Sequence, residues 1–389
     1  MENNRWGILY CPKAHASKQR EKIQRALDER NVVYDFVQSE STDSVERLMN
    51  MLIHNGYKTI IIVGGDSALN DAVNCLMGVE KQVRDQIALG VIANGVMNDF
   101  ARYWDFKEGN LEQTIDWLVK RRIRKVDLGC IRYTNKKGEA CHRYFLNCVN
   151  VGLIADVMNL RHQARSLLGS RTLSFIVSIF LMIFHRMDYK MHVRINSDTI
   201  NRKVMNMCVG SGPGYGQTPS AVPYNGMLDV SVVYHPELLQ LLAGFWLLLT
   251  GRFLNHRSVH PYRTREVIVE ESQKALVGVD GRLLGTPEGP YRINVELEVI
   301  NFLIPDYPSS DTLASCCSSK MVMLRRLILT SPSCAKAERV RMALLVVMLE
   351  RLAKSSRLTL MASVCPFSVV PKLSFKRNNA SANRPRTCF

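Results

Sequence analysis

Residues 60–73 read IIIVGGDSALNDAV, an apolar run followed by two glycines, an aspartate and a helical pattern without a helix breaker. The run predicts a buried strand and the pattern a helix, so Gly64 and Gly65 mark a strand-to-helix turn. Glycines in such a turn let backbone N–H groups approach a phosphate, and the helix N-terminus adds partial positive charge. The alternative is a tight turn that needs glycine for a positive φ angle. The stretch alone leaves both interpretations open.

Around this stretch, strand and helix patterns alternate through residues 6–125. WGILYCP, VVYDFVQS and QIALGVIAN are strand patterns, and helical patterns such as SKQREKIQRALDERN and NLEQTIDWLVKRR lie between or after them. Such alternation is typical of a parallel sheet with helices on both faces. We therefore predict a doubly wound α/β nucleotide-binding domain over residues 1–125. Ligands of such sheets bind beyond the carboxyl ends of the strands, where Gly64 and Gly65 lie.

From about Lys125 the hydrophobic period changes to two. HRYFLNCVNVG, GMLDVSVVYH and YRINVELEVINFLIP alternate or are rich in β-branched residues. Alternation of this kind predicts strands, so we expect an antiparallel β-rich domain over residues 126–291. The last strand, at about residues 292–305, is a candidate to return to the first domain. The fold class is thus α/β plus β, with an active cleft between the two domains.

The net charge of +16 is unevenly distributed along the 389 residues. Residues 306–389 contain 14 Lys or Arg and four acidic residues, so they carry +10 and the preceding residues only +6. The composition of this last segment is typical of a basic disordered tail or a non-native segment, and we assign it no function. The mildly basic charge of residues 1–305 would favour binding to an anionic membrane surface. Its basic residues are not interleaved with aromatics as in a nucleic-acid-binding module, so we expect no nucleic acid as a partner.

Two long apolar stretches interrupt the β pattern, at residues 173–184 and 238–249. Both are shorter than the roughly 20 residues of a membrane-spanning helix. They are interpreted as core helices or as a surface that meets a membrane. The N-terminus lacks the charged start and apolar centre of a signal peptide, and the eleven cysteines contain no CxxC pair. These features predict a cytoplasmic protein with reduced thiols.

Three acidic or glycine-bearing turns each follow a strand: GGDSALND, NGVMNDFAR at residues 94–102 and VDGRLLG at residues 279–285. All three are therefore expected to line one cleft. Phosphoryl transfer needs a backbone cradle for phosphates, carboxylates for Mg²⁺ and a carboxylate that orients or deprotonates the attacking hydroxyl. The three turns contain candidates for each part.

These turns resemble motifs of the diacylglycerol kinase catalytic family, the bacterial soluble lipid kinases related to sphingosine kinases and more distantly to NAD kinases. GGDSALNDAVN resembles that family's GGDGTxNE, and VIANGVMNDFAR its PxGTGNDFAR. RKVDLG, LNCVNVGLIADV, GYGQTPSAVPYNGMLDV, GRFLNH and VGVDGR resemble further family segments in the same order. The resemblance covers residues 6–305, and it implies that the domain at residues 126–291 is an antiparallel β-sandwich that binds the lipid. Each motif is weak alone, and the ordered set is specific.

The resemblance implies a soluble kinase that uses ATP and Mg²⁺, phosphorylates a membrane lipid and works at the inner face of the membrane as a peripheral protein. A homodimer is compatible with it. It implies that Asp280 is the general base, and that Asp66 and Asp99 are the other two catalytic carboxylates. The same comparison implies nucleotide-binding and metal-binding positions, which are Gly64, Gly65, Asp66, Ser67, Asn70, Gly95, Asn98 and Arg102 for the nucleotide and Asp127 and Asp229 for the metal.

For Asp127 and Asp229 the alternative is a turn aspartate that accepts backbone hydrogen bonds. The chain also departs from the family pattern. Ser67 and Ala68 stand where Gly-Thr is expected, which alters a hydroxyl ligand and an expected positive-φ position. Val96 and Met97 replace Thr and Gly, and Arg282 replaces a glutamate, where it is a candidate phosphate contact.

The leading hypothesis is an ATP-dependent lipid kinase acting on a hydroxyl of a lipid such as diacylglycerol. Alternatives are a sphingoid-base or ceramide kinase, and a catalytically degenerate lipid- or nucleotide-binding protein, which the departures at Ser67 and Arg282 would suit. An NAD kinase-like enzyme fits the GGD turn but not the NDFAR turn followed by a long β-rich domain. The motifs do not identify the lipid, because acceptor choice depends on the shape of the pocket.

Overall fold

The computed structural model describes residues 5–11, 17–40, 44–95, 98–107, 109–168, 188–234, 240, 244, 247 and 253–306. The first apolar stretch, residues 173–184, and the tail from residue 307 onward lie outside the described residues, as do Val96 and Met97. Only three positions of the second apolar stretch are described, Gln240, Gly244 and Leu247. Among the described helices, none combines the length and the apolar character that crossing a membrane requires.

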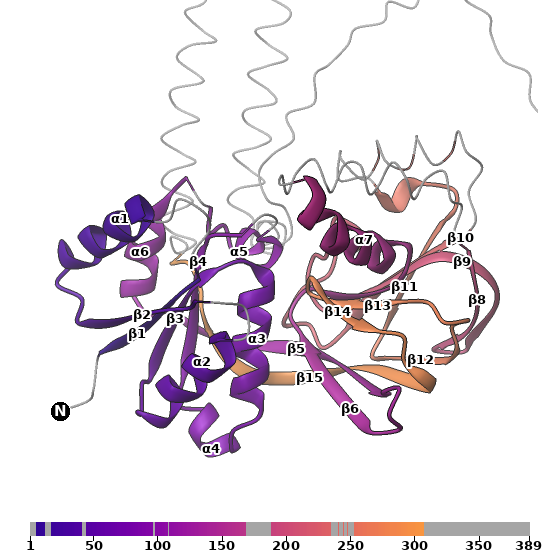
Figure 1. Cartoon of the computed structure of the whole chain (residues 1–389), viewed down its shortest axis with the longest axis horizontal. Helices are drawn as coiled ribbons and strands as arrows, with labels where there is room; N and C mark the ends of the chain where they lie inside the picture. The colour runs from indigo at the N-terminus through magenta and orange to yellow at the C-terminus, as the bar shows by residue number, and fades with distance from the viewer. Residues whose placement is uncertain are drawn as a thin grey trace, which may run out of the picture. The chain divides into compact units, whose positions relative to one another are not determined.

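The N-terminal half is a parallel sheet with helices on both faces, as the alternating pattern predicts (Figure 1). Its four strands run in the order β4-β3-β1-β2 and are β1 (Trp6–Tyr10), β2 (Tyr34–Gln38), β3 (Thr59–Gly64) and β4 (Ala88–Ala93). The helices are α1 (Ser17–Asp28), α2 (Ser44–His54), α3 (Asp66–Met77), α4 (Lys81–Arg84), α5 (Asp99–Tyr103) and α6 (Leu111–Val119). Helix α1 packs on α6 and α2 packs on α3.

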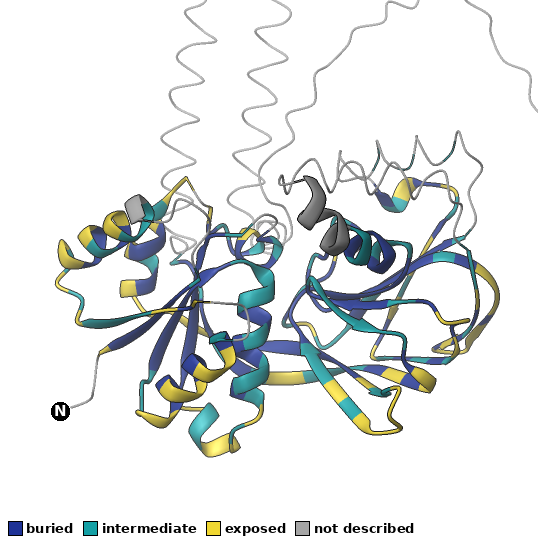
Figure 2. Cartoon of the chain, in the orientation of Figure 1, coloured by how far each residue is buried: buried dark blue, intermediate teal, exposed yellow. Residues whose placement is uncertain are grey.

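Burial explains why these segments form strands. Every residue of β1, β3 and β4 is buried, which is expected of parallel strands covered on both faces. Figure 2 shows the buried residues concentrated in the strands and the exposed residues on the outer helices. Hydrophobic association of these strands with the inner faces of the helices forms the first core of the protein.

The second half is β-rich, and its strands pair antiparallel with one another, as the period of two predicts. Within the described part of this half, helix α7 (Leu153–Leu168) and a short 3₁₀ turn, η1 (Phe253–Asn255), interrupt the strands. Its strands enclose a second apolar core. They are β5 (Ile123–Thr134), β6 (Ala140–Phe145), β7 (Cys148–Gly152), β8 (Tyr189–Ile195), β9 (Asp198–Gly210), β10 (Leu228–Tyr234), β11 (Val259–Thr264), β12 (Glu266–Glu271), β13 (Val277–Val279), β14 (Arg282–Gly285) and β15 (Glu288–Leu303).

The two halves share one continuous strand. The first part of β15 pairs antiparallel with β12 and β5, whereas its end pairs parallel with β4, where Asn301 faces Ala88. The polypeptide therefore runs from the β-rich half back into the sheet of the first half. The pairing joins Asn301 and Phe302 to Ala88 and Leu89, the first two residues of β4.

Gly129 of β5 tests how tightly the second core is packed. A Cβ atom at this position would overlap the ring of Phe145, its partner on β6, whose side chain is fully buried. We expect Gly129→Ala to lower the free energy of unfolding by about 1–3 kcal/mol, because a packed core resists added volume. Urea denaturation measures this. Gly109→Ala is the control, since no described atom lies within 4 Å of its added carbon; equal effects of the two changes would contradict the packing argument.

Candidate active site

The glycines of the turn between β3 and α3 allow the backbone of another turn to lie against them. Gly65 precedes α3 and has an extended backbone, with φ of −99°, so the alternative of a positive-φ turn is wrong at this position. A Cβ atom on Gly65 would lie 2.8 Å from the Cα of Gly95, which belongs to the turn after β4. The backbones of the two predicted turns are therefore in contact. Side chains on both glycines would force the turns apart.

Asp66 connects these two turns. It begins α3, and its carboxylate accepts backbone hydrogen bonds from Asp99 (2.9 Å) and Phe100 (3.2 Å) at the start of α5. Burial raises the pKa of Asp66, and the two N–H donors and the Asn147 side chain oppose this shift. Asp66 therefore fixes the position of Asp99 through the backbone.

Asp99 is the more accessible member of this pair. Its Oδ2 accepts a hydrogen bond from the backbone of Tyr215 (3.0 Å), and its Oδ1 lies 3.8 Å from the Arg102 guanidinium. Burial raises the pKa of Asp99 to about 6, and the negative charge of Asp66 adds to the shift. The side chain is 11% exposed. Asp99 thus combines a raised pKa with access from the cleft.

Asn98 shapes the turn that leads to Asp99. Its backbone is left-handed, with φ of 51°, a conformation that asparagine adopts more readily than most residues. Its Oδ1 accepts from the Gly95 N–H (2.7 Å) and its Nδ2 donates to the Gly95 carbonyl (3.0 Å). Both groups of this buried side chain are used within the turn.

Asp280 lies in the two-residue turn between β13 and β14. Asp280 and Gly281 have φ of 44° and 86°, as the Asp-Gly dipeptide predicts for a type I′ hairpin. The carboxylate accepts four hydrogen bonds, two on each oxygen. Its donors are the backbone N–H groups of Leu146 (2.7 Å), Asn147 (3.0 Å) and Cys148 (2.9 Å) and the side-chain amide of Asn70 (3.0 Å).

The Asp280 carboxylate is held in place by hydrogen bonds on both of its oxygens. The side chain is buried, with 1% exposure. Burial raises the pKa of Asp280 to about 7, against the N–H donors, which lower it. All four partners donate, so they match an ionised carboxylate and leave no acceptor for a protonated one. The role of general base stays a prediction for Asp280, but its hydrogen-bonding capacity is already used.

Asn70 and Asp71 of α3 extend this contact between the halves. Asn70 is fully buried, donates to the Tyr144 carbonyl (2.8 Å) and accepts from Arg143 (2.8 Å), so it supports Asp280 and β6. Asp71 accepts from Arg143 (2.6 Å) and pairs with Arg282 of β14. The positive charge of Arg282 is therefore used in an ion pair across the halves.

Ser67 and Ala68 lie inside α3 and neither has a positive φ angle. The expectation that Ser67 occupies a positive-φ position is therefore wrong, and serine costs little here because the backbone is helical. The N–H groups of the first helical turn have no intrahelical partner, as at any helix start. Gly281 lies across from this turn, since a Cβ on it would be 3.9 Å from Ser67 and 3.3 Å from the Tyr215 hydroxyl.

Two further buried polar atoms are candidates for contact with a ligand. Asn147 Oδ1 and Ser211 Oγ are buried and have no hydrogen-bond partner among the described residues. Asn147 also contacts Asp66 through its side chain. An unpartnered buried oxygen costs about 1–3 kcal/mol, a cost that a bound group could remove. An oxygen beside a carboxylate is the donor set that Mg²⁺ prefers.

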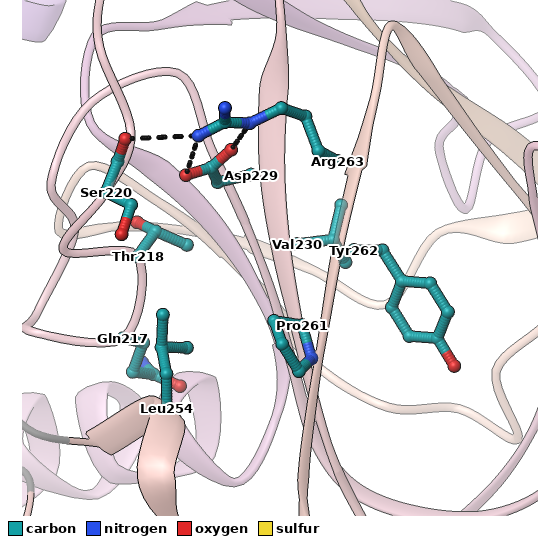
Figure 3. A pocket seen from close by; sticks show the side chains of 9 residues that line it. All are labelled: Gln217, Thr218, Ser220, Asp229, Val230, Leu254, Pro261, Tyr262 and Arg263. Atoms are coloured by element: carbon teal, nitrogen blue, oxygen red, sulfur yellow. Dashed lines mark hydrogen bonds and ion pairs between the residues drawn. The ribbon is translucent and has the colours of Figure 1, made fainter.

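Asp127 and Asp229, the predicted metal positions, have other partners. Asp127 is buried in β5 and accepts from the backbones of Gly226 (2.7 Å) and Glu298 (2.8 Å), which matches the alternative of a turn aspartate. Asp229 pairs with Arg263 (2.7 Å) in the wall of a pocket of about 330 Å³ that Gln217 also lines (Figure 3). The described residues include no cluster of three or more acidic, histidine or cysteine ligands. The metal roles stay predictions.

Sequence reasoning did not single out Asn147, Tyr215 or Arg143. Asn147 stands between the buried Leu146 and Cys148, and a polar residue inside an apolar run is a signal that could have identified it. Tyr215 contributes its backbone N–H, which no side-chain pattern reveals. Arg143 contacts α3, more than 70 residues away in the sequence.

Asp99 and Asp280 are expected to respond oppositely to amidation. Asp99→Asn keeps an acceptor for Tyr215 and removes a buried charge. Asp280→Asn replaces one acceptor oxygen by a donor, which leaves two buried N–H donors unsatisfied. At pH 7.5 we expect Asp280→Asn to lower the free energy of unfolding by about 2–4 kcal/mol and Asp99→Asn to leave it unchanged or higher. Urea denaturation of both variants measures this, and equal destabilisation would contradict the assigned roles.

The Asp99 effect is expected to depend on pH. Its pKa of about 6 in the folded protein exceeds the unfolded value, so the folded state binds more protons between these values. The contribution of Asp99 to the free energy of unfolding of wild type is therefore fully present below about pH 4 and is lost as the pH rises through about 6. Asp99→Asn should therefore be more stable than wild type by about 2 kcal/mol at pH 7.5, and by much less at pH 4.5. A pH-independent difference would contradict the raised pKa.

Comparisons with known proteins agree with this geometry. The diacylglycerol kinase catalytic domain model matches residues 6–131, and the YegS C-terminal NAD kinase beta sandwich-like domain model matches residues 147–304. The protein YtlR of Bacillus subtilis is 23% identical over 290 residues, which cover 71% of this chain and 89% of that protein. A diacylglycerol kinase of Staphylococcus aureus (strain bovine RF122 / ET3-1) is 22% identical over 299 residues, which cover 76% and 88%.

A solved structure has the same fold. The crystal structure of a diacylglycerol kinase from Bacillus anthracis strain Sterne superposes with a TM-score of 0.53 at 13% identity, and the match covers 78% of this chain and 98% of that one. At such identity the likeness shows the fold alone. The two domain models, matched in order along residues 6–304, show that the chain belongs to the diacylglycerol kinase catalytic-domain family.

Proposed function

We propose that the protein is an ATP-dependent lipid kinase that transfers the γ-phosphate to a hydroxyl of a membrane lipid such as diacylglycerol. The observation that carries this proposal is the hydrogen bond (2.9 Å) that joins Asp66, the first residue of α3, to Asp99, the first residue of α5, with Asp280 holding the β-rich half against α3 through Asn70. Phosphoryl transfer requires this combination of phosphate donors and carboxylates. We place the activity at the inner face of the membrane.

Each part of the site suits one role. The first-turn N–H groups of α3 and the Ser67 hydroxyl suit the phosphates of ATP. Asp66 and the unpartnered Asn147 Oδ1 would hold Mg²⁺, which when bound neutralises charge on the phosphates. Asp99 suits the proton acceptor for the lipid hydroxyl, since among the described residues its Oδ1 has only the Arg102 contact at 3.8 Å. Asp280 would position Asn147 by accepting a hydrogen bond from its backbone N–H.

An acceptor panel tests the proposal. The purified full chain is incubated with labelled ATP, Mg²⁺ and either diacylglycerol, ceramide, a sphingoid base or NAD. We expect labelled phospholipid, with transfer reduced at least about 100-fold in Asp99→Asn, because general base catalysis contributes about 10²–10⁴-fold. Folded protein that binds ATP but labels no acceptor would favour the degenerate binding protein instead, and label in NAD would favour the NAD kinase-like alternative.

The rate should depend on pH with a definite sign. A base must be unprotonated to accept the hydroxyl proton, so kcat/KM should rise from pH 5 to 7 with a midpoint near the Asp99 pKa of about 6. Initial rates in buffers of constant ionic strength measure the profile. The residual activity of Asp99→Asn should lack this rise. A rise that survives in Asp99→Asn would assign the base to another carboxylate.

A further inference from the structure

Seven consecutive exposed residues connect α6 to β5. This segment reads VKRRIRK, residues 119–125, and is named here the basic edge. It contains five basic residues and two exposed large apolar ones, Val119 and Ile123. Leu297, 55% exposed, lies further along the same ladder, in the bulge of β15 near Asp127. Three of the five exposed large apolar side chains among the described residues therefore lie on or near this edge.

The charge of the basic edge is only partly balanced. Lys120 and Arg122 both pair with Asp306 (2.9 Å each). Arg124 lies over the ring of Tyr224, 3.6 Å from its centroid. Arg121 and Lys125 form no ion pair with residues that the structure describes. The edge therefore presents net positive charge together with apolar side chains.

Aromatic contacts hold the basic edge beside the candidate active site. Tyr224, under Arg124, also contacts Trp104 (5.7 Å between ring centroids) and accepts a hydrogen bond from the Tyr103 hydroxyl (3.3 Å). Tyr103 ends α5 and Trp104 follows it, whereas Asp99 begins the same helix. One short helix thus separates the edge from Asp99, and a surface bound there would lie close to the site.

We propose that the basic edge docks the protein on an anionic lipid bilayer. Lys and Arg attract anionic headgroups, while exposed apolar side chains enter the interfacial region, and this combination is typical of peripheral membrane contact. The docked bilayer presents the acceptor lipid next to α5. The inference shares the lipid acceptor with the proposed function, but docking requires no turnover and is measured separately.

Vesicle co-sedimentation of the full chain tests the proposal. The test variant carries Arg121→Asn and Lys125→Gln, and asparagine suits the positive φ of 49° at position 121. Each basic residue near an anionic surface contributes about 1 kcal/mol, so binding to vesicles of phosphatidylglycerol and phosphatidylcholine should weaken about 30-fold. The matched control is Lys136→Gln with Lys137→Gln, two exposed lysines in the turn between β5 and β6, and it should bind like wild type.

The contribution of apolar contact is tested with Ile123→Ser. We expect weaker binding to the same vesicles, with the loss persisting at high salt, where charge attraction is screened. Wild type should bind vesicles of phosphatidylcholine alone poorly. Equal loss in the control variant, or no loss in the test variant, would overturn the proposal. Binding of wild type to a short duplex DNA but not to anionic vesicles would overturn it in favour of nucleic acid.

Activity assays separate this inference from the proposed function. If the chain is a lipid kinase, the Arg121→Asn, Lys125→Gln variant should lose activity on diacylglycerol in anionic vesicles but keep it on diacylglycerol in neutral detergent micelles. If wild type is inactive but binds vesicles about 30-fold more tightly than the variant, the kinase proposal is overturned and the docking proposal stands. If wild type is active but the two substitutions leave its vesicle binding unchanged, the docking proposal is overturned and the kinase proposal stands.

Discussion

The Asp280 carboxylate accepts hydrogen bonds from both halves of the fold, and the geometry of the site depends on it. Three donors belong to the backbone before and at the start of β7, and the fourth is Asn70 of α3. A buried carboxylate is costly unless every oxygen has partners, so alternative packings of the halves are disfavoured. The Asp71 contacts with Arg143 and Arg282 act in the same direction. The cleft is therefore defined by polar contacts that tolerate little displacement.

Three carboxylates, those of Asp66, Asp99 and Asp280, lie close enough to affect one another's protonation. Asp66 raises the pKa of Asp99, and it also raises that of Asp280. Arg102 opposes this effect only from the surface, with its side chain 62% exposed. Such crowding lowers stability in the empty protein and becomes favourable when cationic or hydrogen-bonding ligands arrive. Functional sites are commonly less stable than the rest of the fold that contains them.

Much of this structure could be predicted from local patterns, since the alternating strands and helices of the first half, the period of two in the second and the turn after a strand at Asp280 all formed as expected. What local patterns could not supply was contact at long range. Gly65 is small because Gly95 lies against it, 30 residues later, and not because of its own φ angle. The expected positive φ at Ser67 rested on the glycine of the family motif, whereas the position is helical in this chain. The four donors of Asp280 lie more than 130 residues away in sequence.

Strand β15 has a consequence for the order of substrate binding. Because it is hydrogen-bonded to β12 and β5 at one end and to β4 at the other, swinging one half away from the other would break a β ladder. Enzymes whose domains are joined only by loops close around a first substrate and so create the site for the second. Under the proposed function, the nucleotide and acceptor sites would be assembled before either substrate arrives. Nucleotide and acceptor are thus expected to bind in random order, with kinetics in which neither is obligatory first.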